Sequence, residues 1–177
     1  MSNDLWATPP EVFEALDKEF CFGFDVCAEE ETAKCRRFWT VESDALSKDW
    51  ALDTMESFQG ERFPSGTLWC NPPYSKITPW VEKAIEAQLN GRMTVMLVMC
   101  DPSVKWFSLA QQYASETRFI TDGRLAFLKN GVPQKGNNKG SVIFVFDPHR
   151  VRAGHVSFVT REALMEKGKI NKLEVAA

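Results

Sequence analysis

The sequence has few of the side chains that build metal sites and disulfide frameworks. Its 177 residues include two histidines, His149 and His155, and five cysteines that form no Cys-x-x-Cys pair. An odd number of cysteines without paired spacing argues against a disulfide framework, and two histidines near the C-terminus argue against a zinc site. We therefore expect neither structural disulfides nor a bound metal.

Long apolar runs are also absent. No stretch of 18 or more apolar residues is long enough to cross a membrane, and residues 1–4 lack the charged-then-apolar pattern of a signal peptide. With 177 residues, 44% of them hydrophobic, the chain is long enough to form one domain with a substantial core. These features predict a globular, cytoplasmic protein.

The net charge of −3 conceals an unequal distribution along the chain. Residues 1–63 hold 15 acidic and 6 basic side chains, whereas residues 64–177 hold 9 acidic and 15 basic ones. The second part would therefore attract a polyanion. Segment 118–140 contains a single acid, Asp122. Its basic residues are Arg118, Arg124, Lys129, Lys135 and Lys139. By itself this cluster is compatible with a solvated face or with a nucleic-acid site.

Apolar periodicity predicts strands that alternate with helices. Thr8, Pro9 and Glu11 form a typical helix start, with Thr8 as the cap, and apolar residues at helical spacing continue to about residue 20. Further helices are predicted to begin near 78 and 101. Short apolar runs predict strands at 22–26, 67–70, 93–99, 117–121, 124–128 and 141–146. Alternation followed by a strand pair predicts an α/β fold, with a mostly parallel sheet and an antiparallel edge strand.

The stretch Leu68–Tyr74, with the sequence LWCNPPY, is the most informative part of the chain. Two consecutive prolines offer no N–H, so their carbonyls only accept hydrogen bonds. Asn71 adds a side-chain acceptor, and Tyr74 adds an aromatic face. Such a rigid set of acceptors suits a planar ring that carries an NH2 group. The alternative is a proline-rich turn with a surface tyrosine, but the occurrence of all four residues, Asn71 to Tyr74, directly after an apolar strand favours the first interpretation.

Asp25 stands at the end of the first predicted strand, before Cys27, Ala28 and an acidic loop. Nucleotide-type cofactors bind at this edge of open α/β sheets. A carboxylate at this point also serves as a loop cap. By itself, Asp25 leaves both interpretations open.

Together, these segments resemble the DNA N6-adenine methyltransferases, and the small phage-encoded Dam-type family in particular, over about residues 4–148. The matching segments are Trp6-x-Thr8-Pro9, Asp25-Val26-Cys27-Ala28, Ser43-Asp44-Ala45-Leu46 and Asn71-Pro72-Pro73-Tyr74. One departure is that larger relatives carry a Gly-rich loop after the first strand, where this chain has Glu29-Glu30-Glu31.

The resemblance implies a class I methyltransferase fold, a Rossmann-like three-layer sandwich. Residues 1–150 would form the catalytic domain and residues 151–177 a peripheral C-terminal extension with a short helix. The cofactor would be S-adenosylmethionine, the partner would be DNA, and the setting would be the cytoplasm of a bacterium that carries a phage or prophage.

The resemblance also assigns roles to individual residues. Asn71 and the Pro72 carbonyl would accept hydrogen bonds from the target amine, and Tyr74 would stack on the base, so the catalytic set is Asn71, Pro72, Pro73 and Tyr74. The cofactor-binding set is Trp6, Thr8, Pro9, Asp25, Cys27, Ala28, Asp44, Leu46 and Asn71. The DNA-binding set is Arg118, Arg124, Lys129, Lys135, Asn137, Asn138 and Lys139.

The implied activity is direct in-line methyl transfer to N6 of an adenine flipped out of DNA. Low sequence specificity is expected, because no connection is long enough for a separate recognition domain. Cytosine N4, an RNA adenine and a protein glutamine remain alternative targets. A non-catalytic DNA-binding module is a further alternative, against which the intact Asn71–Tyr74 motif and Asp44 argue.

Overall fold

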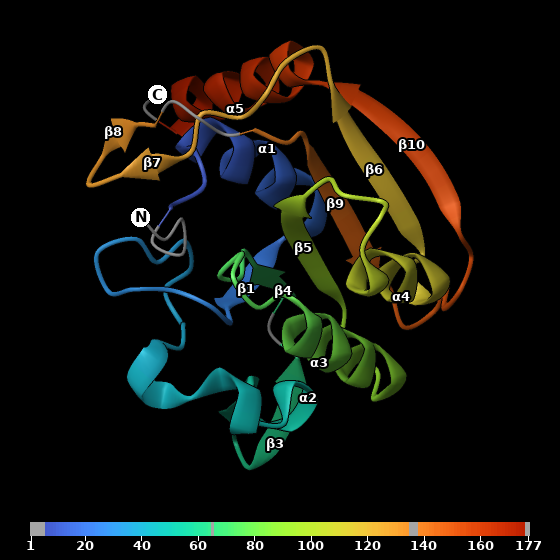
Figure 1. Ribbon diagram of the computed structural model, residues 1–177. Coiled ribbons are helices and arrows are strands. Elements are labelled where there is room, and N and C mark those ends of the chain that lie inside the picture. The colour runs from blue at the N-terminus through green and yellow to red at the C-terminus, as the bar shows by residue number, and fades with distance from the viewer. Residues whose placement is uncertain (1–5, 65, 135–137, 176–177) are drawn as a thin grey trace.

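The structure, a computed structural model, describes residues 6–64, 66–134 and 138–175. A six-stranded sheet with the order β1-β4-β5-β9-β6-β10 lies at its centre (Figure 1). Its strands are β1 (Phe22–Asp25), β4 (Thr67–Cys70), β5 (Thr94–Met99), β9 (Ser141–Phe146), β6 (Glu116–Thr121) and β10 (His155–Thr160). β9 runs antiparallel to both of its neighbours, and the other pairs are parallel. The predicted α/β fold with a mostly parallel sheet is therefore confirmed.

The antiparallel strand does not lie where the sequence placed it. β9 is inside the sheet, between β5 and β6, and the edge strand is β10, which is parallel to β6. The predicted strand at 124–128 is also wrong in extent, since β7 covers Leu128–Lys129 and pairs with β8 (Val132–Pro133) in a small hairpin. A second hairpin joins β2 (Met55–Phe58) to β3 (Glu61–Pro64).

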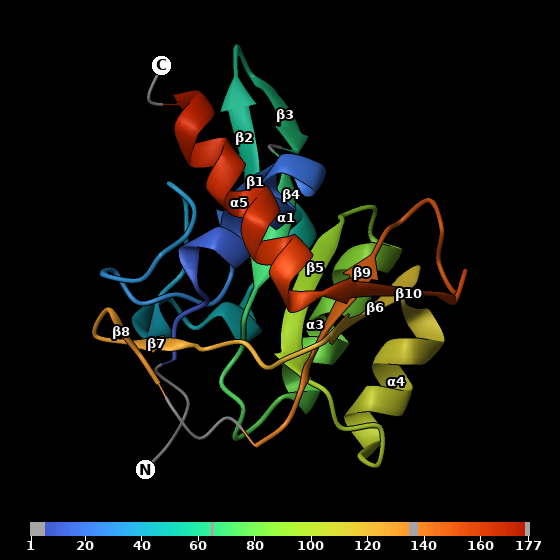
Figure 2. The same ribbon diagram turned by 90° about the horizontal axis from the view of Figure 1, so that it is seen from above.

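Helices cover both faces of the sheet, which gives three layers (Figures 1 and 2). α1 (Pro10–Phe20) and α5 (Arg161–Val175) lie on one face, and α3 (Thr78–Leu89) and α4 (Lys105–Tyr113) lie on the other. Alternate side chains of one strand enter the two apolar layers: Leu68 packs with α3, and Trp69 packs with α1. Strands buried on both faces explain why the sequence shows continuous apolar runs there.

The start of α1 differs from the predicted capping arrangement. The helix begins at Pro10 after Pro9, and no side chain caps it. The Thr8 side chain is buried, and its Oγ1 has no hydrogen-bond partner among the described residues. Thr8 is therefore not the cap of α1, and the burial of its unpaired hydroxyl must have another reason.

The C-terminal part is integrated into the fold. β10 completes the main sheet, and α5 packs on α1 with Leu164 in the core. The two helices approach so closely that a Cβ at Gly168 would lie 1.9 Å from the Glu11 carbonyl oxygen. The described part of 151–177 thus supplies the edge strand of the sheet and a helix that packs against α1.

Candidate active site

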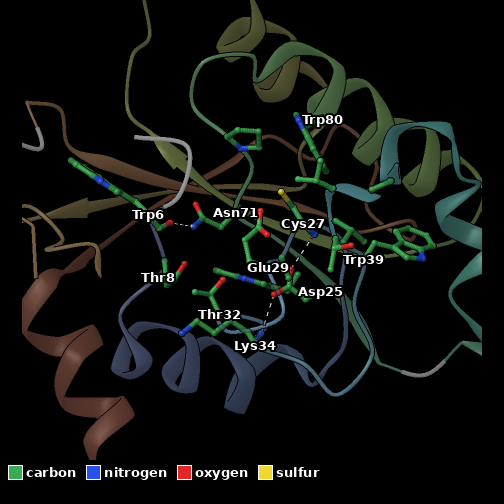
Figure 3. A pocket seen from close by; sticks show the side chains of 18 of the residues that line it. Trp6, Thr8, Asp25, Cys27, Glu29, Thr32, Lys34, Trp39, Asn71 and Trp80 are labelled. Carbon is green, nitrogen blue, oxygen red and sulfur yellow. Dashed lines mark hydrogen bonds between the residues drawn. The ribbon is translucent and has the colours of Figure 1, made fainter. Parts of the chain in front are cut away.

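A cavity of about 290 Å3 opens at the carboxyl ends of β1 and β4 (Figure 3). Its walls come from the N-terminal segment 6–8, the loop after β1, residues 39–46 and the segment that follows β4. Eight of the nine predicted cofactor residues line it: Trp6, Thr8, Asp25, Cys27, Ala28, Asp44, Leu46 and Asn71. Pro9, the ninth, borders a different cavity, between the start of α1 and α5.

Asp25 holds the loop that forms one wall of this cavity. Its side chain is 2% exposed, Oδ1 accepts the Cys27 N–H at 3.1 Å, and Oδ2 accepts the Lys34 N–H at 3.1 Å. Burial raises the pKa of the Asp25 carboxyl to about 7, against the opposing effect of these two hydrogen bonds. Asp25 is therefore a loop cap and also lines the cavity, where its contact with a cofactor stays a prediction.

The other charged and aromatic side chains of the wall favour the binding of a ligand that combines a positive charge with a planar ring system. Glu29 and Asp44 add carboxylates to that of Asp25, and Lys34 adds one positive charge. Asp44 lies between two short 3-10 turns, Val41–Ser43 and Ala45–Ser47, in a left-handed conformation with φ of 48°. Four tryptophans contribute to the wall: Trp6, Trp39, Trp69 and Trp80. Burial raises the pKa of the Cys27 thiol well above its usual range, so this side chain is a neutral wall residue rather than a nucleophile.

Several of these wall residues were missed from the sequence. They are Glu29, Thr32, Lys34, Trp39, Thr40, Val41, Trp69 and Trp80. Glu29, Thr32 and Lys34 follow Asp25 within nine residues, so their closeness in the sequence to a predicted cofactor residue could have indicated that they line the cavity. Trp69 and Trp80 gave no such signal, because an aromatic residue in a strand or helix is most often part of the core.

The Asn71–Tyr74 turn follows β4 at the floor of the cavity. The Asn71 Nδ2–H group donates to the Trp6 carbonyl oxygen at 3.2 Å (Figure 3). The Tyr74 ring packs edge-on against Phe127, with ring centroids 5.9 Å apart, and burial raises its pKa, so the phenol is neutral. The alternative of a turn with a surface tyrosine does not fit this packing.

Three buried polar atoms at this place have no hydrogen-bond partner among the described residues. They are Thr8 Oγ1, Asn71 Oδ1 and the Tyr74 hydroxyl. Buried polar groups are nearly always paired, and each unpaired one costs about 1–3 kcal/mol. Thr8 and Asn71 line the cavity, whereas Tyr74 follows in the same turn as Asn71 but does not line it. The unpaired atoms in the cavity wall indicate a site whose partners arrive with a ligand.

Comparison with known proteins agrees with this geometry. The sequence model of the family described as DNA N-6-adenine-methyltransferase (Dam) matches residues 1–171. The chain belongs to the Dam family. It is 35% identical over 175 residues to the DNA N-6-adenine-methyltransferase of Haemophilus phage HP1 (strain HP1c1), covering 95% of this chain and 93% of that protein. The DNA N-6-adenine-methyltransferase of Escherichia phage T1 is 33% identical over 160 residues, covering 81% of this chain and 62% of that longer protein.

As a Dam-family methyltransferase, the protein is an enzyme that methylates N6 of adenine in DNA. The non-catalytic alternative and the other amine targets are therefore set aside. In the described part of the chain, no helix is long and apolar enough to cross a membrane.

The residues predicted to contact DNA do not form one surface. Arg118 of β6 binds Glu19 at 2.6 Å and Glu116 at 2.8 Å, and its guanidinium lies over the Phe20 ring. The two carboxylates raise the pKa of Arg118. Because Glu19 lies at the end of α1 remote from the cavity, Arg118 belongs to an ion-pair network away from the cavity.

Four of the other predicted contacts can be placed on the structure. Arg124 and Asn138 are exposed, and Lys129 lies on the β7–β8 hairpin. Lys139 forms an ion pair with Asp101 and thereby lowers the pKa of that carboxyl to about 2. Lys135 and Asn137 lie outside the described residues.

Proposed function

We propose that the cavity binds S-adenosylmethionine and that the enzyme transfers the methyl group directly to N6 of an adenine flipped out of DNA. One observation carries this proposal. Asn71 stands in the wall of a cavity near the lower end of the size range of small-molecule sites, and its buried Oδ1 has no partner within the described part of the chain. An acceptor held in this way requires a donor from the substrate, and an exocyclic amine supplies one.

The wall residues fit the proposed cofactor. A sulfonium cation gains from nearby carboxylates and from aromatic faces, and both kinds of group line the cavity. The exposed carboxylate of Asp44 is suited to accept from the adenine amino group of the cofactor, with Leu46 against the ring. Thr8 Oγ1 and the Asp25 loop would then hold the methionine end.

The reaction mainly requires that the target nitrogen, the methyl group and the sulfur of the cofactor be held in line. S-adenosylmethionine supplies a methyl group that its sulfonium centre already activates. Asn71 Oδ1 and the Pro72 carbonyl would accept the two hydrogens of the target N6, which favours a tetrahedral nitrogen with a free lone pair. Tyr74, held edge-on by Phe127, would offer its ring to the base. A paired base is out of reach of such a buried turn, so flipping is required.

We infer that DNA binds at the β7–β8 hairpin and at segment 134–140, in which the described residue Asn138 is exposed. Arg124 and Lys129 would contact phosphates, which position the protein without reading sequence. Lys135, Asn137 and Asn138 are further candidates from the sequence. The hairpin turn and the loop are short, so we expect low sequence specificity. Since the substrate is DNA and the relatives are phage proteins, we expect the enzyme to act in the cytoplasm of a bacterial host.

Incubation of the purified enzyme with labelled cofactor and plasmid DNA, followed by digestion to nucleosides, tests the proposal. N6-methyladenine is the expected product. Asn71→Ala should lower the rate about 30- to 1,000-fold, corresponding to about 2–4 kcal/mol by analogy with oxyanion-hole donors, and should leave cofactor binding intact. Asn90→Ala, at the exposed end of α3, is the matched control.

Near wild-type transfer by Asn71→Ala would contradict the proposed catalytic role. Mapping the modified adenines along the plasmid tests specificity separately. Confinement to one motif of four or more bases would refute low specificity but leave the methyl-transfer proposal standing.

A further inference from the structure

The amide of Asn71 is fixed at one end only. Its Nδ2–H group donates to the Trp6 carbonyl oxygen at 3.2 Å, while Oδ1 is buried and has no partner among the described residues. A backbone carbonyl can only accept hydrogen bonds. The Trp6 carbonyl therefore requires the NH2 end of the amide on its side and directs the oxygen end elsewhere.

The Trp6 carbonyl is itself held by the β7–β8 hairpin. The next residue, Ala7, exchanges two backbone hydrogen bonds with Leu128 of β7: Ala7 N–H to Leu128 O at 2.8 Å, and Leu128 N–H to Ala7 O at 2.9 Å. The Trp6 ring stacks on Phe127, with ring centroids 6.4 Å apart and an interplanar angle of 24°. Segment 6–8 is thus attached to the hairpin on one side and to Asn71 on the other (Figure 3).

We propose that segment 6–8 is a positioning element, in which the Trp6 carbonyl, pinned through Ala7 to Leu128, sets the orientation of the Asn71 amide. The inference rests on the proposed role of Asn71 Oδ1 as the acceptor for the target amine. Without this tie the amide would be free to turn its NH2 group toward the substrate, and two donors would then face each other. Because the tie comes from β7, the hairpin that we place against DNA also controls the catalytic acceptor.

The same geometry explains why an amide rather than a carboxylate occupies position 71. An ionised Asp at this position would set a charged oxygen against the Trp6 carbonyl oxygen, with no donor between them. A protonated Asp restores the arrangement, because its O–H group donates to the Trp6 carbonyl and its other oxygen accepts from the amine.

The first test is therefore the pH dependence of kcat in the full-length Asn71→Asp variant. The ratio of its kcat to that of the wild type should rise as pH falls from 8.5 to 5.5. The slope should approach about tenfold per pH unit above the pKa of the new carboxyl, which burial raises. A flat ratio, or inactivity of Asn71→Asp at every pH, would overturn the inference.

The second test removes the tie without touching the site. Leu128→Pro deletes the N–H that donates to the Ala7 carbonyl, while Leu128→Ala keeps that N–H and trims only the side chain. Leu128→Pro should lower kcat about tenfold or more relative to Leu128→Ala, a larger factor than any change in its affinity for S-adenosylmethionine or for a duplex oligonucleotide. Equal kcat values in the two variants would refute the positioning role.

These outcomes separate the inference from the function on which it rests. An active Asn71→Ala enzyme would mean that the proposed catalytic role itself fails. An inactive Asn71→Ala enzyme, together with a flat pH ratio for Asn71→Asp, would remove only the positioning element.

Discussion

Replacing Thr8 with valine should stabilise the ligand-free enzyme and weaken its binding of the cofactor. The Thr8 side chain is 1% exposed, and its Oγ1 has no partner among the described residues. Valine has nearly the same shape and carries no buried hydroxyl. Removing the unpaired group should recover about 1 kcal/mol, at the lower end of the cost of a buried unpaired polar atom. For a domain of this size, that corresponds to a rise in Tm of about 2–4 °C.

The effect on the cofactor should have the opposite sign. Thr8 lines the cavity, so we expect its hydroxyl to gain a partner when the proposed cofactor binds. Loss of one hydrogen bond costs about 0.5–1.5 kcal/mol, which raises Kd about 2- to 12-fold. Scanning calorimetry of the ligand-free protein and titration calorimetry with S-adenosylmethionine measure the two effects in one variant.

Thr94→Val is the matched control. The Thr94 Oγ1 atom is also buried without a partner among the described residues, but it lies at the start of β5, at the opposite end of the strand from the cavity edge. This variant should raise Tm and leave Kd unchanged. If Thr8→Val lowered Tm and did not alter Kd, the hydroxyl would have a structural partner and the reasoning from unpaired atoms would be refuted.

Three further predictions concern charge. Burial raises the pKa of Asp25 to about 7, so between about pH 4 and 7 this carboxyl is protonated in the folded ligand-free enzyme and ionised in the unfolded chain. The contribution of Asp25 to folding stability should therefore be fully present below about pH 4 and be lost as the pH rises through 7. A cation in the cavity favours the ionised form, so cofactor affinity should rise between pH 6 and 8, and titration calorimetry should show this dependence abolished in Asp25→Asn. Lys129→Glu should weaken binding to all DNA sequences alike and reduce its salt dependence, as fluorescence anisotropy would show, and an unchanged affinity would remove the hairpin from the DNA surface. Arg118→Gln should leave DNA affinity unchanged but cost about 2 kcal/mol in urea unfolding, because Glu19 and Glu116 lose their charged hydrogen bonds to the guanidinium and keep only Lys167 and Ser157, respectively, among the described residues.

The sequence by itself determined those strands, helices and turns that are specified by residues adjacent in the chain. The strands β5 and β9 are buried on both faces of the sheet, so every residue after the first, Thr94 and Ser141, is apolar and the pattern was plain. The Asn71–Tyr74 turn was equally easy to recognise, because its hydrogen-bond acceptors and its aromatic ring come from four adjacent residues. The helix at 10–20 followed from apolar spacing alone, whatever capped it.

Tertiary structure decided what depends on partners far away in the chain. β10 was missed because an edge strand is only partly buried, and its alternating exposed residues resemble those of a loop. Arg118 was assigned to DNA because its basic neighbours are adjacent in sequence, whereas the Glu19 that neutralises it is 99 residues away. Thr8 was predicted to cap a helix, but the pairing of Ala7 with Leu128 holds this segment across the cavity instead. Eight of the nine predicted cofactor residues line the cavity, because each motif is a short run that the sequence shows directly. The hydrogen bonds of these residues depended on which groups the fold brought within reach.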